Sequence, residues 1–116
     1  MPTFPQNAKL SQPDHYRRVF ESPEYKVSSG AFLLLATPGA TPSSRLGVVV
    51  AKKNIRRAVR RNRIKRLVRE QFRLYPFDAA IDLVVLARSG ADQLDNPSVW
   101  QELDRLWRTL KQKVNA

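Results

Sequence analysis

Residues 52–73 read KKNIRRAVRRNRIKRLVREQFR, and this stretch decides the fold. It contains eleven of the 21 Lys and Arg residues of the chain and a single acidic residue, Glu70. It has no Gly or Pro, its apolar residues recur at helical spacing, and an apolar run comes directly before it. Most basic clusters are solvated surfaces, but these features predict a folded, positively charged helix.

The predicted helix runs from about Arg57 to Leu74 and has two distinct faces. Its apolar stripe has steps of three or four residues and consists of Ile64, Leu67, Val68, Phe72 and Tyr75. At about 100° per residue, the opposite side collects Asn62, Arg66, Arg69 and Arg73, flanked by Arg63. Ile55 and Val59 are out of phase with the stripe. Either the helix bends near Arg60, or a loop precedes it and pins Val59 separately into the core.

Apolar runs on both sides of this helix predict a sheet. Residues 25–27 and 31–37 flank a Ser-Ser-Gly turn and read as a short strand and a longer one. Residues 45–51 (RLGVVVA) are too apolar for an edge and predict a central strand that leads directly into Lys52. Residues 82–88 (DLVVLAR) predict a second buried strand. A helix that joins two buried strands is expected to cover one face of the sheet.

Two further helices are predicted near the ends of the chain. Ser11 and Asp14 have the spacing of a capping box, and Tyr16, Val19 and Phe20 then share one apolar face. Residues 96–114 begin with an Asn-Pro start signal and carry both tryptophans on an apolar side that is expected in the core. The resulting order is αβββαβα, an α+β arrangement in a single domain over residues 1–116, with residues 1–10 as a mobile or loosely docked arm.

Composition excludes several classes of protein. A net charge of +11 and an isoelectric point near 10.9 imply a polyanionic partner, either nucleic acid or an anionic membrane. The chain has no cysteine and one histidine, His15, so disulfides are excluded and a zinc site is not expected. There is no signal-peptide core, and the longest apolar run is too short to span a bilayer, so we expect a cytoplasmic protein.

No catalytic constellation is present in the sequence. It has no Ser/His/Asp arrangement, no cysteine nucleophile and no glycine-rich phosphate loop. Asp78 and Asp82 stand near a helix end and a strand start, where capping or solvated roles are expected, and a metal-dependent nuclease needs converging acids. The residues therefore favour binding over catalysis. A membrane partner is not expected, because the apolar stripe of the basic helix is needed to cover the sheet.

The arginines of the basic helix match the geometry of phosphate. Forked guanidinium donors bind phosphate oxygens in pairs, and a folded RNA suits one helix flanked by strands better than duplex DNA does. Asn62 either reads a base edge or orients an arginine, or it is a simple exposed polar residue. Tyr16 and Phe20 either pack in the core or stack on nucleotide bases. The sequence is compatible with either role for each of these three residues.

One motif links the chain to a known family. Residues 61–69 read RNRIKRLVR after the Lys52-Lys53 pair, and this pattern resembles the protein subunit of bacterial ribonuclease P. The resemblance extends to the Y-x-x-V-F pattern of the first helix, the Leu-Gly-Val of residues 46–48, the D-x-V-V-x-A-R strand at 82–88 and the L-x-x-L-W pattern that ends at Trp107. The alternative is a basic structural protein of another ribonucleoprotein, such as a ribosomal protein.

The resemblance implies a two-layer αβββαβα sandwich with a mixed four-stranded sheet, as in a ribosomal protein domain. It implies a left-handed βαβ crossover through the basic helix, whereas general topology rules favour a right-handed one. It also implies that a separate RNA subunit removes the 5′ leader from precursor tRNA, using Mg²⁺ held mainly by that RNA and the substrate. This chain is then an accessory subunit without catalytic or metal-binding residues and without an obligate protein partner.

The resemblance also assigns two RNA-binding surfaces to this chain. The surface implied for the catalytic RNA consists of Lys52, Lys53, Arg57, Arg61, Asn62, Arg63, Lys65, Arg66 and Arg69. The surface implied for the 5′ leader lies in a cleft between the first helix and the sheet and consists of Tyr16, Phe20, Phe32, Leu35 and Arg88.

Overall fold

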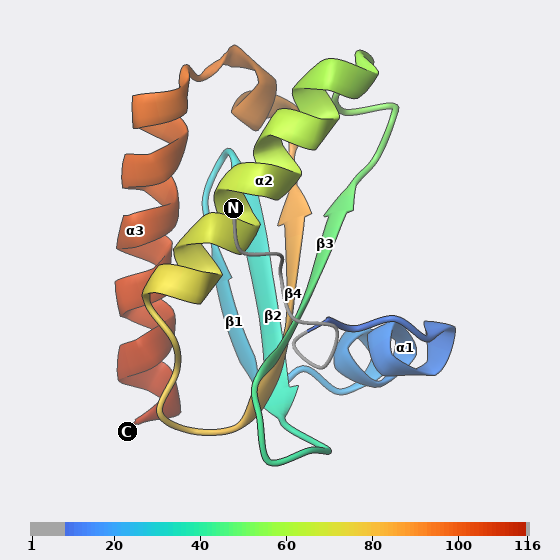
Figure 1. Ribbon diagram of the computed structural model, residues 1–116, viewed down its shortest axis with the longest axis vertical. Coiled ribbons are helices and arrows are strands. Elements are labelled where there is room, and N and C mark those ends of the chain that lie inside the picture. The colour runs from blue at the N-terminus through green and yellow to red at the C-terminus, as the bar shows by residue number, and fades with distance from the viewer. Residues whose placement is uncertain (1–8, 116) are drawn as a thin grey trace.

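The computed structural model describes residues 9–115, and its helices and strands follow the predicted order, with one short 3₁₀ helix added (Figure 1). The elements are α1 (Pro13–Glu21), β1 (Tyr25–Ser28), β2 (Phe32–Pro38), β3 (Arg45–Val50), α2 (Ala58–Leu74), β4 (Ile81–Ala87), the 3₁₀ helix η2 (Ser89–Gln93) and α3 (Asn96–Val114). The basic stretch therefore forms α2, as its pattern predicts.

The four strands form one mixed sheet in the order β1-β2-β4-β3. β2 is antiparallel to β1 and to β4, whereas β3 runs parallel to β4. In Figure 1, β3 and β4 both point upward, α2 crosses in front of the sheet, and β4 lies to the left of β3. This path is a left-handed crossover, so the expectation from the family resemblance is confirmed against the general preference for right-handed connections.

β3 is an edge strand, so the prediction of a central position for residues 45–51 is wrong. The strand is apolar because both of its faces are covered, one by α2 and the other by Tyr16 of α1. Part of its outer edge is covered as well. Lys9 forms an isolated parallel bridge with Leu46, and the amide of Leu10 donates to the carbonyl of Leu46 at 3.0 Å.

The predicted mobile arm covered residues 1–10, of which residues 1–8 lie outside the described part of the chain. Lys9 and Leu10 are docked and not mobile, because the bridge to β3 holds this segment and the Leu10 side chain is buried. Leu10 packs with Val19, Leu35 and Val84 beneath α1. The hydrophobic effect therefore fixes the start of the described chain on the sheet.

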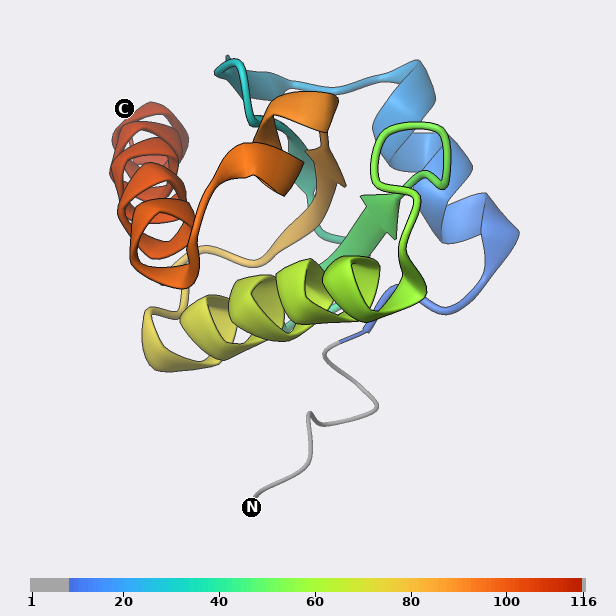
Figure 2. The same ribbon diagram turned by 90° about the horizontal axis from the view of Figure 1, so that it is seen from above.

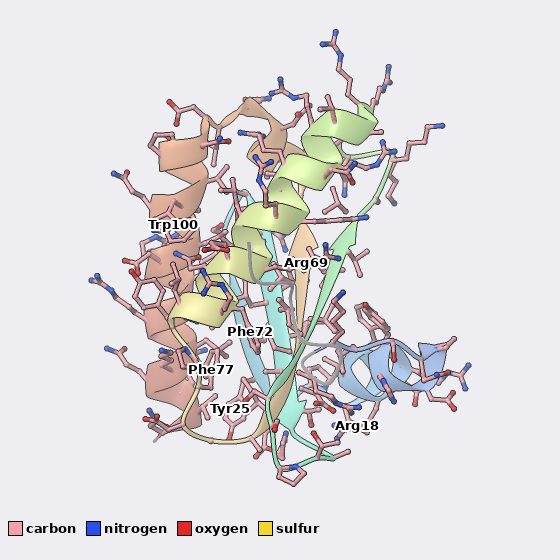
Figure 3. All side chains as sticks on the ribbon, viewed as in Figure 1. Arg18, Tyr25, Arg69, Phe72, Phe77 and Trp100 are labelled. Atoms are coloured by element: carbon pink, nitrogen blue, oxygen red, sulfur yellow. The ribbon has the colours of Figure 1, made fainter. Side chains whose placement is uncertain are left out.

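The helices lie on opposite faces of the sheet (Figure 2). α2 and α3 cover one face and enclose the larger core, which contains Leu34, Leu83 and Val85. Phe72 of α2 packs edge-on against the Trp107 ring, and Phe77 packs against the same ring at a tilt. Figure 3 labels Phe72 and Phe77. α1 crosses the other face over a smaller cluster. Because side chains alternate along a strand, this division assigns each strand residue to one face.

The loop before α2 explains the phase change near its start. Ile55 is fully buried and Val59 is 74% exposed, so the loop pins Ile55, not Val59, into the core. The Asn54 side chain also donates to the carbonyl of Ala87 at 3.2 Å, which ties the loop to the end of β4. The helix itself begins at Ala58 without an acidic residue in its first turn.

Asp82 is fully buried in an ion-pair network, so the expectation of a capping or solvated role is wrong. Arg45 donates to both carboxylate oxygens, from Nε at 3.0 Å and from Nη2 at 2.8 Å. Arg18 of α1 also donates to Asp82, and its Nη1 donates to the carbonyl of Pro38 at 2.9 Å (Figure 3). Burial alone would raise the pKa of Asp82, but the hydrogen bonds from Arg45 and Arg18 outweigh it and lower the pKa.

Helix starts differ from the predicted caps by one residue. α1 begins after Gln12, and the imidazole of His15 accepts from the Ser11 and Gln12 amides, so the Ser11–Asp14 box is not formed. α3 is capped by Asp95, whose carboxylate accepts from the Ser98 amide at 2.9 Å. The predicted core contains Trp107, but Trp100 is only partly buried and lies outside both core clusters.

Candidate RNA interface

The outward face of α2 carries polar and basic side chains that remain exposed. Ile64, Val68 and Phe72 are buried beneath the helix, which places Asn62, Arg66, Arg69 and Arg73 on the solvent side as predicted. Arg73 pairs with Glu70. Within residues 9–115, no hydrogen bond or ion pair occupies the side chains of Asn62, Lys65, Arg66 and Arg69. These four groups are available to an external partner.

Two of the predicted RNA-binding arginines also have structural roles. Arg61 Nη1 donates to the carbonyls of Ile55 and Arg56, at 3.1 and 2.6 Å, and so braces the loop before α2. Arg63 Nη1 donates to the carbonyl of Leu94 at 3.1 Å and to Asn96 Oδ1 at 2.7 Å. The guanidinium of Arg63 therefore holds the segment between η2 and α3 against α2.

Two depressions lie along the N-terminal half of α2 and share Arg60, which forms an ion pair with Asp92. The first has a volume of about 480 Å³ and is lined by Lys53, Asn54, Arg56, Arg57, Arg60 and Asp92. The second has a volume of about 600 Å³ and is lined by Val59, Arg60, Asn62, Arg63, Arg66, Gln93, Leu94 and Asp95. Of the predicted basic residues, Lys53 and Arg57 line the first depression and Arg63 and Arg66 line the second, and Lys52 is exposed next to Lys53 in the chain.

α1 presents a second surface on the other face of the sheet. Val19 is fully buried beneath the helix, whereas Phe20 is 42% exposed and is therefore not a core residue. Tyr16 is half-buried and lies directly on β3, where a Cβ at Gly47 would stand 2.5 Å from Tyr16 Cε1. Because Gly47 has no side chain, the Tyr16 ring can pack directly against the backbone of β3. Leu35 lies beneath α1 in the same cluster, with Leu33, Val49 and Leu86 partly exposed around it.

Phe32 does not belong to this surface, so its predicted place in the cleft is wrong. It alternates with Leu33 and Leu35 along β2, and its fully buried ring points into the core beneath α2 and α3. Arg88 follows β4, is exposed, and donates from Nη1 to the carbonyl of Ser29 at 2.9 Å. It is therefore tied to the turn between β1 and β2.

The pKa of Tyr16 is shifted by two opposing effects. Burial raises it, and the positive charge of Arg69 on α2 lowers it. Burial is the larger effect, so the pKa is raised overall. Figure 3 shows Arg69 on α2.

The described residues offer no acidic or imidazole cluster for a metal ion. Among them, no group of three or more His, Cys, Asp or Glu side chains is placed to hold one. Asp82, the buried carboxylate, is saturated by two arginines. None of the described helices is long and apolar enough to cross a membrane.

The comparisons with known proteins decide the family. The family model for ribonuclease P matches residues 4–111. The chain belongs to the ribonuclease P protein family. The ribonuclease P protein component of Marinobacter nauticus is 46% identical over 111 residues, covering 96% of this chain and 84% of the relative. The corresponding component of Chromohalobacter salexigens is 46% identical over 112 residues, covering 96% and 88%.

Solved structures of ribonuclease P proteins share this fold. The protein of Staphylococcus aureus matches with a TM-score of 0.83 and 25% identity, over 90% of this chain and 95% of that one. The protein of Thermotoga maritima matches with a TM-score of 0.73 and 28% identity, over 90% and 96%. The family role is in tRNA processing, as the protein component of a ribonucleoprotein nuclease. The alternative of a ribosomal protein is thereby excluded.

The structure of this ribonuclease P protein also adds residues that the sequence did not single out. Arg56, Arg60, Asp92 and Gln93 line the depressions beside α2, and Gly47 seats Tyr16. The basic stretch already contained Arg56 and Arg60, so charge alone was a usable signal for them. Asp92 and Gln93 come from η2, which approaches α2 only through tertiary packing.

Proposed function

We propose that this chain binds the catalytic RNA subunit of ribonuclease P through α2 and the 5′ leader of precursor tRNA through the α1 surface, in the cytoplasm. It acts as an accessory subunit, and the RNA subunit carries out the Mg²⁺-dependent cleavage. One observation supports this assignment most strongly: α2 buries its apolar stripe, and the side chains of Asn62, Lys65, Arg66 and Arg69 have no hydrogen-bond or ion-pair partner among residues 9–115.

Charge supports RNA as the partner of α2. Guanidinium groups bind phosphate oxygens through paired donors, and each neutralised phosphate releases counterions. Arg66 and Arg69 project from a helix that other contacts hold at both ends. Arg61 and Arg63 tie its first turns to the preceding loop and to the segment before α3, and Gln71 donates to the Trp100 carbonyl near its other end. A rigid array of fixed cations suits a folded RNA with a fixed pattern of phosphates.

The α1 surface suits a single strand. Tyr16 lies beside partly exposed apolar residues of β2, β3 and β4, and Phe20 is an exposed aromatic residue on the same helix. Unpaired bases stack on such rings with little sequence preference. Mature tRNA lacks the leader, so this surface would contribute to binding of the precursor alone. Mg²⁺ is assigned to the RNA subunit and the substrate, because Asp82 is already paired with two arginines.

Replacing Phe20 with Ala is expected to lower affinity for precursor tRNA by about tenfold, because one stacked base contributes on the order of 1–3 kcal/mol. Affinity for mature tRNA is expected to stay the same. The measurement is binding of both RNAs by the assembled holoenzyme. Tyr75→Ala is the matched control, since Tyr75 is 45% exposed but lies at the end of α2. An equal loss for precursor and mature tRNA would contradict the leader role of α1.

Reconstitution tests the proposal that the RNA subunit cleaves the substrate and that this chain is an accessory subunit. We expect the purified protein to copurify with one large RNA from its native cell, and this RNA with Mg²⁺ to cleave precursor tRNA, faster when the protein is added. The protein without RNA is expected to show no cleavage at any Mg²⁺ concentration. RNA-free cleavage by protein treated with a nuclease would overturn the accessory role.

A further inference from the structure

Gly47 lies in the middle of β3, where the strand itself gives no reason for a glycine. Glycine weakens a strand, because it loses more conformational freedom on folding and has no side chain to pack. Within residues 9–115 no glycine has a positive φ, so the backbone of Gly47 is open to any L-residue. The parallel register with Val84 continues through it without a bulge. The reason must therefore be the close approach of another group.

That group is the side chain of Tyr16. The three nearest neighbours of a Cβ at Gly47 would be Cε1, Cζ and Oη of Tyr16, at 2.5, 2.8 and 2.8 Å. Carbon atoms in ordinary contact are about 3.5–4.0 Å apart, so even a methyl group is excluded. Gly90 differs, since a Cβ there would meet the main-chain carbonyl oxygen of Gly30 at 2.6 Å. Gly90 makes room for backbone, whereas Gly47 makes room for a ring that can turn away.

The register of the sheet places this contact at the border of the α1 surface. Val84 pairs with Gly47 on one side and with Leu35 on the other, and this row lies beneath α1. The next row on the same face is partly exposed and packs against the same cluster. It consists of Leu33, Leu86 and Val49. Side chains two residues apart on a strand share a face, so the Tyr16 ring lies one row from these exposed residues.

We propose that Gly47 is a positioning residue for the 5′ leader, because its missing side chain lets the Tyr16 ring lie against β3 at the depth where a leader nucleotide stacks on it. This inference rests on the proposed leader role of α1. A Cβ at position 47 would push the ring about 1 Å away from the strand, and a gap of this size forfeits a quarter to a half of a dispersion contact. Gly47 itself acts only through Tyr16.

Replacing Gly47 with Ala is expected to have opposite effects on stability and on leader binding. The Tm should stay equal or rise, because alanine restricts the unfolded chain and the strand backbone accepts it. Affinity of the holoenzyme for precursor tRNA should fall about fivefold, through the partial loss of one stacking contact. Affinities for mature tRNA and for the catalytic RNA should not change. Gly30→Ala is the matched control, since a Cβ there meets no atom within 4 Å.

A glycine with a purely structural role would give a different result. Its replacement would lower the Tm and weaken the binding of precursor and mature tRNA equally, and this outcome would contradict the proposal. A Gly47→Ala protein that does not fold would contradict it as well, because the proposal requires that the ring, and not the strand, gives way.

A double-mutant cycle tests whether Gly47 acts through Tyr16. In a Tyr16→Ala background, Gly47→Ala is expected to cause no further loss of affinity for precursor tRNA. A full loss in that background would overturn the positioning role. Unchanged affinity in Gly47→Ala, together with a loss in Tyr16→Ala, would also overturn it but leave the leader role of α1 intact. If Tyr16→Ala binds precursor tRNA as the wild type does, the leader role of Tyr16 fails, and the positioning role fails with it.

Discussion

Replacing Arg66 and Arg69 together with Ala is expected to lower affinity for the catalytic RNA about a hundredfold while the Tm stays nearly unchanged. Both side chains are exposed and have no ion pair among the described residues, so their loss removes no internal contact. A hydrogen bond to a charged group contributes on the order of 1.5 kcal/mol, which corresponds to about tenfold in affinity for each arginine.

The salt dependence of binding separates a phosphate contact from a general loss of charge. The slope of log K against log salt concentration is expected to fall by about two, one for each released contact. The control is Arg105→Ala with Arg108→Ala, which removes the same charge from α3, where both arginines pair within their own helix. A fall in Tm with the α2 pair, or an equal loss of affinity with the α3 pair, would contradict the assignment.

Replacing Asp82 with Asn is expected to reduce the free energy of unfolding by on the order of 3 kcal/mol, because it leaves two arginines facing a buried neutral group. For a domain of this size the Tm should fall by roughly 10 °C. Arg18 keeps its hydrogen bond to the Pro38 carbonyl but loses its ion pair with Asp82, so one of the contacts between α1 and the sheet is weakened. Thermal unfolding followed by circular dichroism measures both quantities.

The same carboxylate gives stability a defined dependence on pH. Its folded-state pKa is lowered, so its contribution is fully present above the unfolded value of about 3.9 and is lost as pH falls through the folded value. The wild type is therefore expected to lose stability below about pH 4 more steeply than Asp82→Asn. Asp104→Asn is the control, since its surface pair with Arg108 contributes less than about 1 kcal/mol. An equal loss of stability below about pH 4 in the wild type and in Asp82→Asn would refute this role of the carboxylate.

Local patterns were sufficient to predict the helices and the strands. The stripe of Ile64, Val68 and Phe72 predicted which face of α2 is buried, and the basic residues opposite it are exposed. β-branched runs predicted β3 and β4 within one residue of their bounds. These features depend on residues close in sequence, for which periodicity is a direct physical signal.

Features that depend on tertiary packing were beyond local patterns. β3 reads as a central strand because α1, α2 and Leu10 cover it, and none of these contacts is local. Phe32 was expected on the face of the sheet that α1 covers, but it lies on the other face. The face of a strand residue depends on strand register, which a run of apolar residues such as Phe-Leu-Leu-Leu does not fix. The ion pairs of Asp82 with Arg18 and Arg45 join residues far apart in sequence, and they form only when the strands and α1 pack together.

The positive charge of the candidate site was predictable from sequence, but the internal hydrogen bonds of its individual arginines were not. The motif at residues 61–69 identified a basic helix and its family, and helical periodicity already placed Arg66 and Arg69 opposite the apolar stripe. The structure adds that Arg61 and Arg63 donate to neighbouring segments, whereas Arg66 and Arg69 face solvent. The choice of Arg66 and Arg69 as the pair to mutate therefore follows from the sequence, and the structure shows why Arg61 and Arg63 are less suitable.

Site-specific crosslinking tests the central claim most directly, because the chain has no cysteine and any introduced thiol is unique. A photocrosslinker is attached at Val59→Cys on α2, at Glu21→Cys beside Phe20, or at Gln112→Cys on α3, all exposed positions. In holoenzyme bound to precursor tRNA, we predict that position 59 labels the catalytic RNA, position 21 labels the 5′ leader, and position 112 labels neither. Equal labelling from all three positions, or labelling of the leader from position 59 and of the catalytic RNA from position 21, would contradict the account.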